Sequence, residues 1–240
     1  MRRRFFVEQF TGNTAAIAGD AAHHLGRVLR AQEGQLYELS DGQRVRLGRI
    51  EKVARDRVEF SLLEEIPADQ PAIDVTLLLA IVKFDAFEWA IEKATELGVS
   101  TIVPLAAARS EKALLAAAGK RADRWKKILA EASQQSRRVR VPLLRDLEQP
   151  ALAFSSHATA PIKIMLSERP DAPTLRQILQ AEPPRRQAFL AIGPEGGWTD
   201  AEFAAAQAAG FREASLGNLI LRTETAVAAA LASINYALAE

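Results

Sequence analysis

From residue 73 onward, short apolar runs alternate with stretches of helical periodicity, and this alternation constrains the fold more than any other feature of the chain. Residues 75–82 are apolar enough for a strand that is buried on both faces. The next stretch places its apolar residues on one face of a helix that should end at Gly98. Strands that alternate with helices form parallel sheets, so the sequence predicts an α/β domain over residues 72–240.

The alternation continues to the end of the chain. Apolar runs predict further strands at 101–105, 162–166, 188–192 and 214–216. Helical periods predict further helices at 121–138, 200–209 and 224–239. The last helix should present an apolar face formed by Val227, Ala230, Leu231, Ile234 and Leu238.

Residues 1–71 follow a different pattern, of short strands broken by turns. Residues 36–39 and the alternating residues 45–50 flank an Asp-Gly pair at 41–42, which is a common hairpin turn. This pattern predicts a small β-barrel-like domain. The segment 66–71 combines two prolines with polar residues, and the pattern changes after it, so the domain boundary is placed there.

Composition excludes several kinds of chemistry. The chain has no cysteine, which rules out disulfides, thiolate chemistry and cysteine-bound zinc. Its three histidines leave few ways to build a metal site, so we expect none. No apolar run approaches the roughly 18 residues of a membrane span, and the first residues lack the features of a signal peptide. A cytoplasmic protein without membrane contact is expected.

Positive charge is concentrated in two parts of the chain, although the net charge is only +1. Lys and Arg outnumber Asp and Glu in residues 1–57 and again in residues 120–145. Such blocks can bind the phosphates of a nucleic acid, and a solvated surface is an equally simple explanation.

The most informative segment is 189–202, in which an apolar strand leads into a glycine-rich turn and then a helix. Thr199 can cap this helix and Glu202 can complete a capping box, which stabilises a helix start by roughly 1 kcal/mol. The glycines allow positive φ angles and a close approach of the backbone to a ligand. A tight connection without a ligand is the alternative.

A second glycine-containing loop, 216–226, leads into the last helix, which Thr223 can cap. Its apolar residues are either part of the core or part of a ligand site. Neither loop fits G-x-G-x-x-G, and the chain contains no G-x-x-x-x-G-K-[ST] or G-x-S-x-G. A nicotinamide-dependent oxidoreductase is therefore disfavoured.

Taken together, the loops 193–197 and 216–226 resemble the cofactor loops of the SPOUT class of methyltransferases, most closely those of its 16S ribosomal RNA uridine N3-methyltransferase family. The resemblance spans nearly the whole chain. It also includes Arg3-Arg4-Phe5-Phe6, His24 to Arg30, Lys83, 92–98 and 131–138. Each piece is weakly specific, whereas their order and spacing together are strongly specific.

This resemblance implies a PUA-like β-barrel that binds RNA, followed by a SPOUT domain whose C-terminal part forms a trefoil knot. It implies S-adenosylmethionine as the cofactor and methylation of N3 of a uridine in the 16S ribosomal RNA of the small subunit. It also implies a homodimer, for which the apolar face of the last helix gives only permissive support.

The resemblance assigns residues to both ligands. Those assigned to the cofactor are Leu166, Ile192, Gly193, Gly196, Gly197, Leu216, Gly217, Ile220 and Leu221. Those assigned to the RNA substrate are Arg3, Arg4, His24, Arg27, Arg30, Lys83, Gln135 and Arg222. Phosphate contacts from such side chains position RNA without reading its sequence, and a structural or solvated role is the alternative for each.

Methyl transfer to uracil N3 needs an in-line approach, and the N3 proton must leave. A cation can stabilise the resulting anion, and Arg138 is the first candidate because a guanidinium can fork onto a carbonyl oxygen. A surface arginine in a basic run is the alternative. Glu195, Glu131, Glu96 and solvent are all candidates for the proton acceptor, with Glu195 taken as the catalytic assignment.

The chain departs from the family pattern at Asn218-Leu219, where Pro-Arg is expected, so an arginine contact at that loop is lost. Two other functions fit parts of the sequence. A related SPOUT methyltransferase would modify another ribosomal RNA base or a transfer RNA, because the cofactor loops do not choose the substrate. A non-catalytic RNA-binding or ribosome-assembly protein would keep the basic blocks and would not need the glycines of 193–197.

Overall fold

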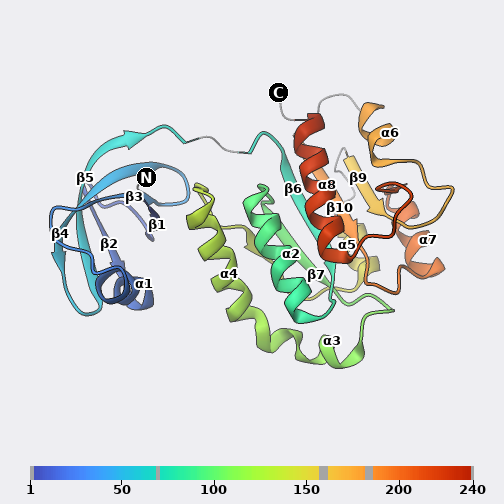
Figure 1. Ribbon diagram of the computed structural model, residues 1–240, viewed down its shortest axis with the longest axis horizontal. Coiled ribbons are helices and arrows are strands. Elements are labelled where there is room, and N and C mark those ends of the chain that lie inside the picture. The colour runs from blue at the N-terminus through green and yellow to red at the C-terminus, as the bar shows by residue number, and fades with distance from the viewer. Residues whose placement is uncertain (1–2, 69–70, 157–161, 182–185, 239–240) are drawn as a thin grey trace. The chain divides into compact units, whose positions relative to one another are not determined.

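The computed structural model describes residues 3–68, 71–156, 162–181 and 186–238, and the chain divides into two compact units (Figure 1). The first unit contains Met1–Gln70 and Ser133–Val141, and the second contains Pro71–Ala132 and Pro142–Glu240. The sequence gives no sign that 133–141 belongs with the first unit. Residues 69–70, in the predicted boundary segment, lie outside the described residues, and domain limits of 1–71 and 72–240 stay a prediction.

The first unit is built on a curled five-stranded sheet with the order β1-β3-β4-β5-β2. The strands are β1 (Arg4–Phe6), β2 (Thr14–Ala18), β3 (Leu36–Ser40), β4 (Val45–Val53) and β5 (Arg57–Ile66). β1 pairs with β3 in parallel, and the other pairs are antiparallel. The predicted hairpin between β3 and β4 is confirmed, with Gly42 at φ +86° and the Asp41 carboxylate accepting from the Gln43 amide at 2.9 Å.

Apolar side chains on one face of this sheet form the core of the first unit, where Leu25, Leu39 and Phe60 are buried almost completely. Gly48 lies in the middle of β4, and only glycine fits there. The Cβ of any other residue would be 2.5 Å from Cδ1 of Leu39. The missing side chain therefore lets Leu39 pack directly against the strand.

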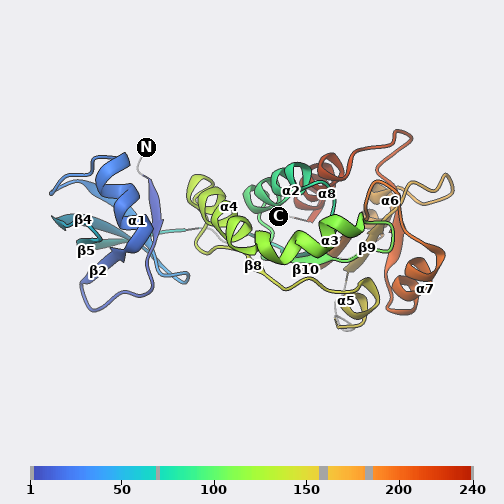
Figure 2. The same ribbon diagram turned by 90° about the horizontal axis from the view of Figure 1, so that it is seen from below.

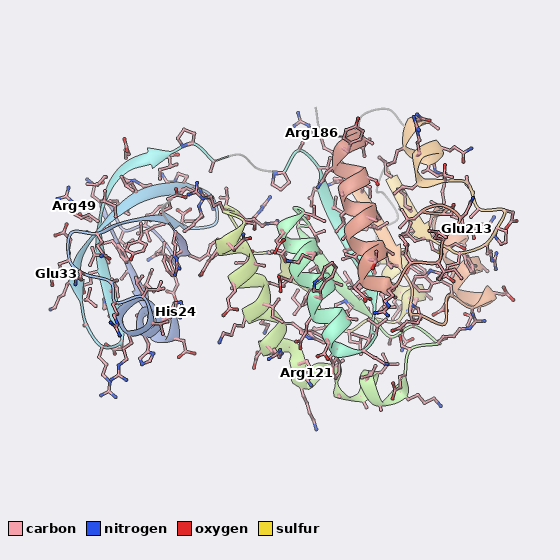
Figure 3. The ribbon with its side chains drawn as sticks, viewed as in Figure 1. His24, Glu33, Arg49, Arg121, Arg186 and Glu213 are labelled. Atoms are coloured by element: carbon pink, nitrogen blue, oxygen red, sulfur yellow. The ribbon has the colours of Figure 1, made fainter. Side chains whose placement is uncertain are left out.

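The segment between β2 and β3 is helical, which the expectation of short strands did not include. Helix α1 (Gly19–His23) continues into a π-helical turn, η1 (His24–Val28). Helical spacing brings Ala22 and Leu25, three residues apart, to the same buried face. His23 and His24 are consecutive helical residues, not alternating residues of a strand, and both are exposed, as Figure 3 shows for His24.

The second unit contains a six-stranded sheet with the order β11-β9-β10-β6-β7-β8. The strands are β6 (Asp74–Ala80), β7 (Thr101–Leu105), β8 (Leu143–Leu144), β9 (Ile162–Leu166), β10 (Gln187–Ile192) and β11 (Arg212–Ala214). Every pair in it is parallel, which confirms the predicted sheet. β11 ends at Ala214, where the predicted strand begins, because Leu216 already belongs to the following loop.

Helices cover both faces of this sheet (Figure 2). The helices that follow β6 in the chain are α2 (Phe84–Glu96), α3 (Lys112–Ala118), α4 (Ala122–Gln135) after the 3-10 turn η2 (Gly119–Arg121), α5 (Pro150–Ser156), α6 (Leu175–Gln180), α7 (Asp200–Ala208) and α8 (Thr223–Leu238). α2 packs against α8, and α5 packs against α7. Leu78 and Ala80 of β6 face the layer of α5 and α7, where Phe154 and Ala206 lie.

The apolar face predicted for the last helix is buried inside the second unit. Val227, Ala230 and Ile234 have no exposed surface, and α8 lies alongside α2 (Figure 1). The Asn235 amide also donates to the Leu97 carbonyl at 2.7 Å. This face therefore packs within the chain and gives no support for a dimer.

Helix α4 ends three residues before the predicted limit of 138 because Arg137 adopts a left-handed backbone conformation, with φ +57°. The Arg138 amide donates to the Ser133 carbonyl at 2.9 Å, and the Arg137 amide to the Gln134 carbonyl at 3.4 Å. These bonds form a Schellman motif, in which a left-handed residue usually filled by glycine reverses the chain.

Candidate active site

Three loops follow the carboxyl ends of β9, β10 and β11, which are neighbours in the sheet. Together they enclose a cavity of about 490 Å³. Ligands of open parallel sheets bind beyond the carboxyl ends of the strands, so this is where a substrate or cofactor is expected.

The loops bring together every residue that the sequence assigned to a cofactor. Leu166, Ile192, Gly193, Gly196, Gly197, Leu216, Gly217, Ile220 and Leu221 all line the cavity. Glu195, the predicted proton acceptor, also lines it and is exposed. The sequence therefore identified the residues of one continuous pocket, although they lie on three separate segments.

The glycines of the loop after β10 are required by close contacts. A Cβ on Gly193 would lie 3.0 Å from the Trp198 ring, and one on Gly196 would lie 3.1 Å from Cβ of Arg109. Gly197 has φ +70° and donates its amide to the Pro194 carbonyl at 2.8 Å. The loop is therefore a tight turn with side chains packed directly on its backbone.

Trp198 connects two of the pocket loops. Its indole Nε1 donates to the Leu166 carbonyl at 3.0 Å, and the side chain is buried. A buried indole needs such a partner, because an unsatisfied donor inside the protein is costly. The end of β9 is thereby fixed to the loop after β10.

The capping box predicted at the start of α7 is confirmed. The Thr199 hydroxyl accepts from the Glu202 amide at 3.3 Å, and the Glu202 carboxylate accepts from the Thr199 amide at 2.8 Å. The second oxygen of Glu202 accepts from the Ala108 amide at 2.9 Å. Glu202 therefore also holds the loop after β7 against the glycine loop.

Thr223 is the first residue of α8 and not its cap, as the sequence had suggested. Its hydroxyl donates to the Gly193 carbonyl at 3.1 Å. The loop before α8 is therefore connected to the glycine loop. The adjacent Arg222 is exposed and is not among the residues that line the pocket.

Arg109, which the sequence analysis did not single out, lies in the loop after β7 and lines the pocket. Its Nη1 donates to the Gly196 carbonyl at 2.7 Å. No local motif marks this residue. Its one signal in the sequence is its position shortly after the predicted strand 101–105. Ligands of parallel sheets bind beyond the carboxyl ends of the strands, so residues at such positions are candidates for a site.

Arg169 forms another part of the pocket wall, where its guanidinium carbon lies 3.7 Å from the centre of the Phe203 ring. It also pairs with Asp200 at 3.0 Å and with Glu213 at 4.0 Å. Its charge is therefore balanced by two carboxylates of the second unit.

Most of the residues predicted to contact RNA are exposed, and they lie outside the pocket lining. They are Arg3, His24, Arg27, Arg30 and Gln135 in the first unit, and Lys83 and Arg222 in the second. Arg30 has φ +51°, so its backbone is held in an unusual left-handed conformation.

Arg4 is a correction to this prediction, because it is buried and its guanidinium is already bound. Its Nη2 lies 2.9 Å from Glu38 Oε2, and its Nη1 donates to the Arg137 carbonyl. An arginine with these partners is part of the internal structure of the first unit and is not available to a phosphate.

Arg138, the predicted catalytic cation, belongs to the first unit and does not line the pocket. Only 9% of it is exposed. Burial lowers the pKa of its guanidinium to about 10, and the positive charge of Arg140 adds to the shift. The side chain is still charged at neutral pH.

Over the described part of the chain, no group of three or more His, Asp or Glu side chains could hold a metal ion. No helix in the same residues is long and apolar enough to cross a membrane.

Comparisons with protein families match both units. An RNA methyltransferase domain family matches residues 69–235, and an RNA methyltransferase PUA domain family matches residues 17–63. The chain is 34% identical to the ribosomal RNA small subunit methyltransferase E of Synechocystis sp., over 95% of this chain and 75% of that protein. It is 33% identical to the Bacillus subtilis protein of the same name, over 98% of this chain and 96% of that protein.

Solved structures give the same result. A ribosomal RNA small subunit methyltransferase E from Neisseria gonorrhoeae, crystallised with S-adenosylmethionine, has a TM-score of 0.89 and 29% identity over 98% of each chain. A methyltransferase from Legionella pneumophila, also with bound S-adenosylmethionine, has a TM-score of 0.88 and 28% identity, over 99% of this chain and 98% of that one.

These likenesses confirm the predicted fold class, an α/β domain of the SPOUT type with a parallel sheet, preceded by a PUA-like domain. The trefoil knot stays a prediction. The matches cover nearly the whole length of the chain and of most of its relatives. The chain therefore belongs to the family of the ribosomal RNA small subunit methyltransferases E.

Proposed function

We propose that the protein transfers a methyl group from S-adenosylmethionine to N3 of a uridine in the 16S ribosomal RNA of the small subunit. The observation that supports this most is the convergence of the three predicted cofactor loops on one pocket. Two of the most similar solved structures contain S-adenosylmethionine. The relatives named above are methyltransferases of small-subunit ribosomal RNA.

The pocket suits a cofactor of this kind. Gly193, Gly196 and Gly197 line the pocket and carry no side chains, so a ligand can approach the backbone of the glycine loop. Leu166, Ile192 and Leu221 offer apolar contacts, while the backbone of 216–221 offers hydrogen bonds to an adenine edge. When bound, S-adenosylmethionine supplies an electrophilic methyl group on a sulfonium.

The protein's own residues would prepare the nucleotide for this reaction. Uracil N3 becomes nucleophilic only when its proton leaves, and the exposed Glu195 in the pocket is the proposed acceptor. The Arg138 guanidinium is the proposed partner of the uracil oxygen on which negative charge develops. Its partial burial strengthens such an interaction, because charges interact more strongly away from water.

We propose that the RNA is positioned by exposed basic and polar side chains of both units. Arg3, His24, Arg27 and Arg30 would contact phosphates from the PUA-like domain, and Lys83, Gln135 and Arg222 would also contact the RNA. Arg4 is omitted because its guanidinium is already bound by Glu38 and by the Arg137 carbonyl. The SPOUT domain is proposed to be knotted and the protein to act in the cytoplasm.

We also propose that the protein is a homodimer. Leu219 and Ile220, in the loop where the family pattern has Pro-Arg, are 82% and 79% exposed. Exposed apolar side chains next to a pocket favour a covering surface, which a second copy would supply. Light scattering at micromolar concentration tests this, and a monomer would exclude it.

The test is methyl transfer from radiolabelled S-adenosylmethionine to unmethylated small ribosomal subunits, followed by mass spectrometry of the digested nucleosides. N3-methyluridine is expected. A different methylated nucleoside would keep the cofactor and change the target base or RNA. No transfer, together with no cofactor binding by calorimetry, would leave a non-catalytic RNA-binding protein.

A further inference from the structure

Arg109 differs from the other arginine of the pocket wall in how its charge is balanced. Arg169 pairs with Asp200 and Glu213. Among the described residues, no carboxylate lies within ion-pair distance of the Arg109 guanidinium, which is exposed and donates only to the neutral Gly196 carbonyl. The Arg109 guanidinium therefore presents to the pocket a positive charge that an anionic ligand can bind.

The backbone on both sides of Arg109 is held in place. The Ala108 amide donates to Glu202 at 2.9 Å, and the buried Ser110 hydroxyl donates to the Ile81 carbonyl at 2.7 Å. The Ser110 amide also donates to the Ala107 carbonyl at 3.0 Å. These contacts fix the loop after β7 to β6 and to the cap of α7, so the Arg109 side chain starts from a rigid base.

The side chain itself is oriented by the glycine loop. It packs over Gly196, where a Cβ would lie 3.1 Å from Cβ of Arg109. One nitrogen, Nη1, is used on the Gly196 carbonyl. A guanidinium has five N–H donors in a planar fork, so donors remain for a second ligand while this bond holds the group in place.

We propose that Arg109 binds a backbone phosphate of the RNA next to the target nucleotide. This proposal rests on the proposed function, because it places the target base in the same pocket. A phosphate suits the site since it matches the fork of a guanidinium and adjoins every nucleotide. The exposure of Arg109 favours RNA, which approaches from solvent, over the carboxylate of a cofactor enclosed by the loops.

Arg109→Gln is the variant that tests this proposal, because glutamine can still donate to the Gly196 carbonyl and has no charge. Binding to unmethylated small ribosomal subunits is measured over a range of salt concentrations, and S-adenosylmethionine binding is measured by calorimetry. The matched control is Arg176→Gln, at an exposed arginine of α6 outside the pocket lining.

In Arg109→Gln, the dissociation constant for the subunits should rise about tenfold, as expected for the loss of one charge-assisted hydrogen bond. The slope of log affinity against log salt should fall by about one. Cofactor affinity should stay within about twofold of the wild type, and Arg176→Gln should leave both affinities unchanged.

Two results would overturn the proposal. If RNA affinity and its salt slope stay at the wild-type values, Arg109 has only a structural role in the glycine loop. If cofactor affinity falls while RNA affinity is unchanged, its anionic partner is the cofactor carboxylate. The proposed function fails separately, when the wild-type protein itself binds no S-adenosylmethionine or transfers no methyl group.

Discussion

Arg4 and Glu38 form an ion pair inside the first unit, with Nη2 of Arg4 2.9 Å from Oε2 of Glu38 and side chains that are 5% and 9% exposed. Arg4 also donates to the Arg137 carbonyl, and the Ser40 hydroxyl donates to the Val139 carbonyl. The pair therefore connects the strands β1 and β3 to the segment that contains Arg138.

Replacing one partner of this pair should destabilise the first unit strongly. Glu38→Ala leaves the buried Arg4 cation without its carboxylate, so the free energy of unfolding should fall by about 3–5 kcal/mol. Urea unfolding followed by circular dichroism measures the loss. The tryptophans, Trp89, Trp125 and Trp198, all lie in the second unit, so their fluorescence is the internal control. A loss under about 1 kcal/mol would mean that the pair is solvated.

The glycine loop should not tolerate a side chain at 193. In Gly193→Ala the new methyl group would contact the Trp198 ring at 3.0 Å, and Trp198 would have to move from the Leu166 carbonyl. The dissociation constant for S-adenosylmethionine should rise at least about tenfold, a change of about 1.4 kcal/mol. Calorimetry measures this. Gly119→Ala is the control, because Gly119 has helical dihedrals and open space around it.

Thr199→Ala should weaken the second unit through its capping box. The Glu202 amide loses its acceptor, so we expect a loss of about 1 kcal/mol, and Thr199→Ser should recover most of it. Tryptophan fluorescence during urea unfolding reports this unit. Equal stability of the alanine and serine variants would show that the box contributes nothing.

Arg138→Ala should abolish methyl transfer and leave S-adenosylmethionine binding unchanged, because Arg138 does not line the pocket. The rate is measured in a single turnover with saturating cofactor. Arg140→Ala removes an exposed arginine two residues away and should keep most of the activity. Full activity in Arg138→Ala would remove this residue from the mechanism.

The lowered pKa of Arg138 predicts a pH limit for the reaction. Methyl transfer should fall as the pH rises through about 10, where the Arg138 guanidinium loses its proton, whereas an arginine with an ordinary pKa would stay charged to a higher pH. Arg140→Ala should move this limit upward, because it removes a like charge. A rate that is unchanged above pH 10 in folded protein would contradict the role of the cation.

The lowered pKa of Arg138 also makes the free energy of unfolding depend on pH. In a range of pH that begins at about 10, the unfolded chain binds more protons at Arg138 than the folded chain does. The folded state therefore gains stability from this group as the pH rises through that range, and the cost of burying the cation is present at lower pH.

The sequence predicted the second unit well because its strands are marked by apolar runs. β7 and β9 have the predicted limits, and α7 begins where the Thr199 capping box indicates. The loops that line the pocket were singled out through their glycines and through the family resemblance. Such patterns involve residues that are close together in the sequence, so they can be recognised from one sequence alone.

The parts that were missed depend on contacts between distant segments. Arg4 looks like a surface cation until Glu38 and Arg137 are placed beside it. Arg109 joins the pocket through Gly196, 87 residues away. The face of α8 predicted for a partner is buried against α2 for the same reason. Periodicity identifies an apolar face and does not say which surface will cover it.

The Schellman motif at the end of α4 has a consequence for how this protein can be divided. The chain leaves the second unit within α4, contributes 133–141 to the first unit, and returns at Pro142. A fragment starting at Pro71 would retain Arg137 and Val139 and lack Arg4 and Ser40, which bind their carbonyls. No single cut in the chain therefore yields two intact units. In evolution, the PUA-like domain could be exchanged only together with residues 133–141, which include Arg138.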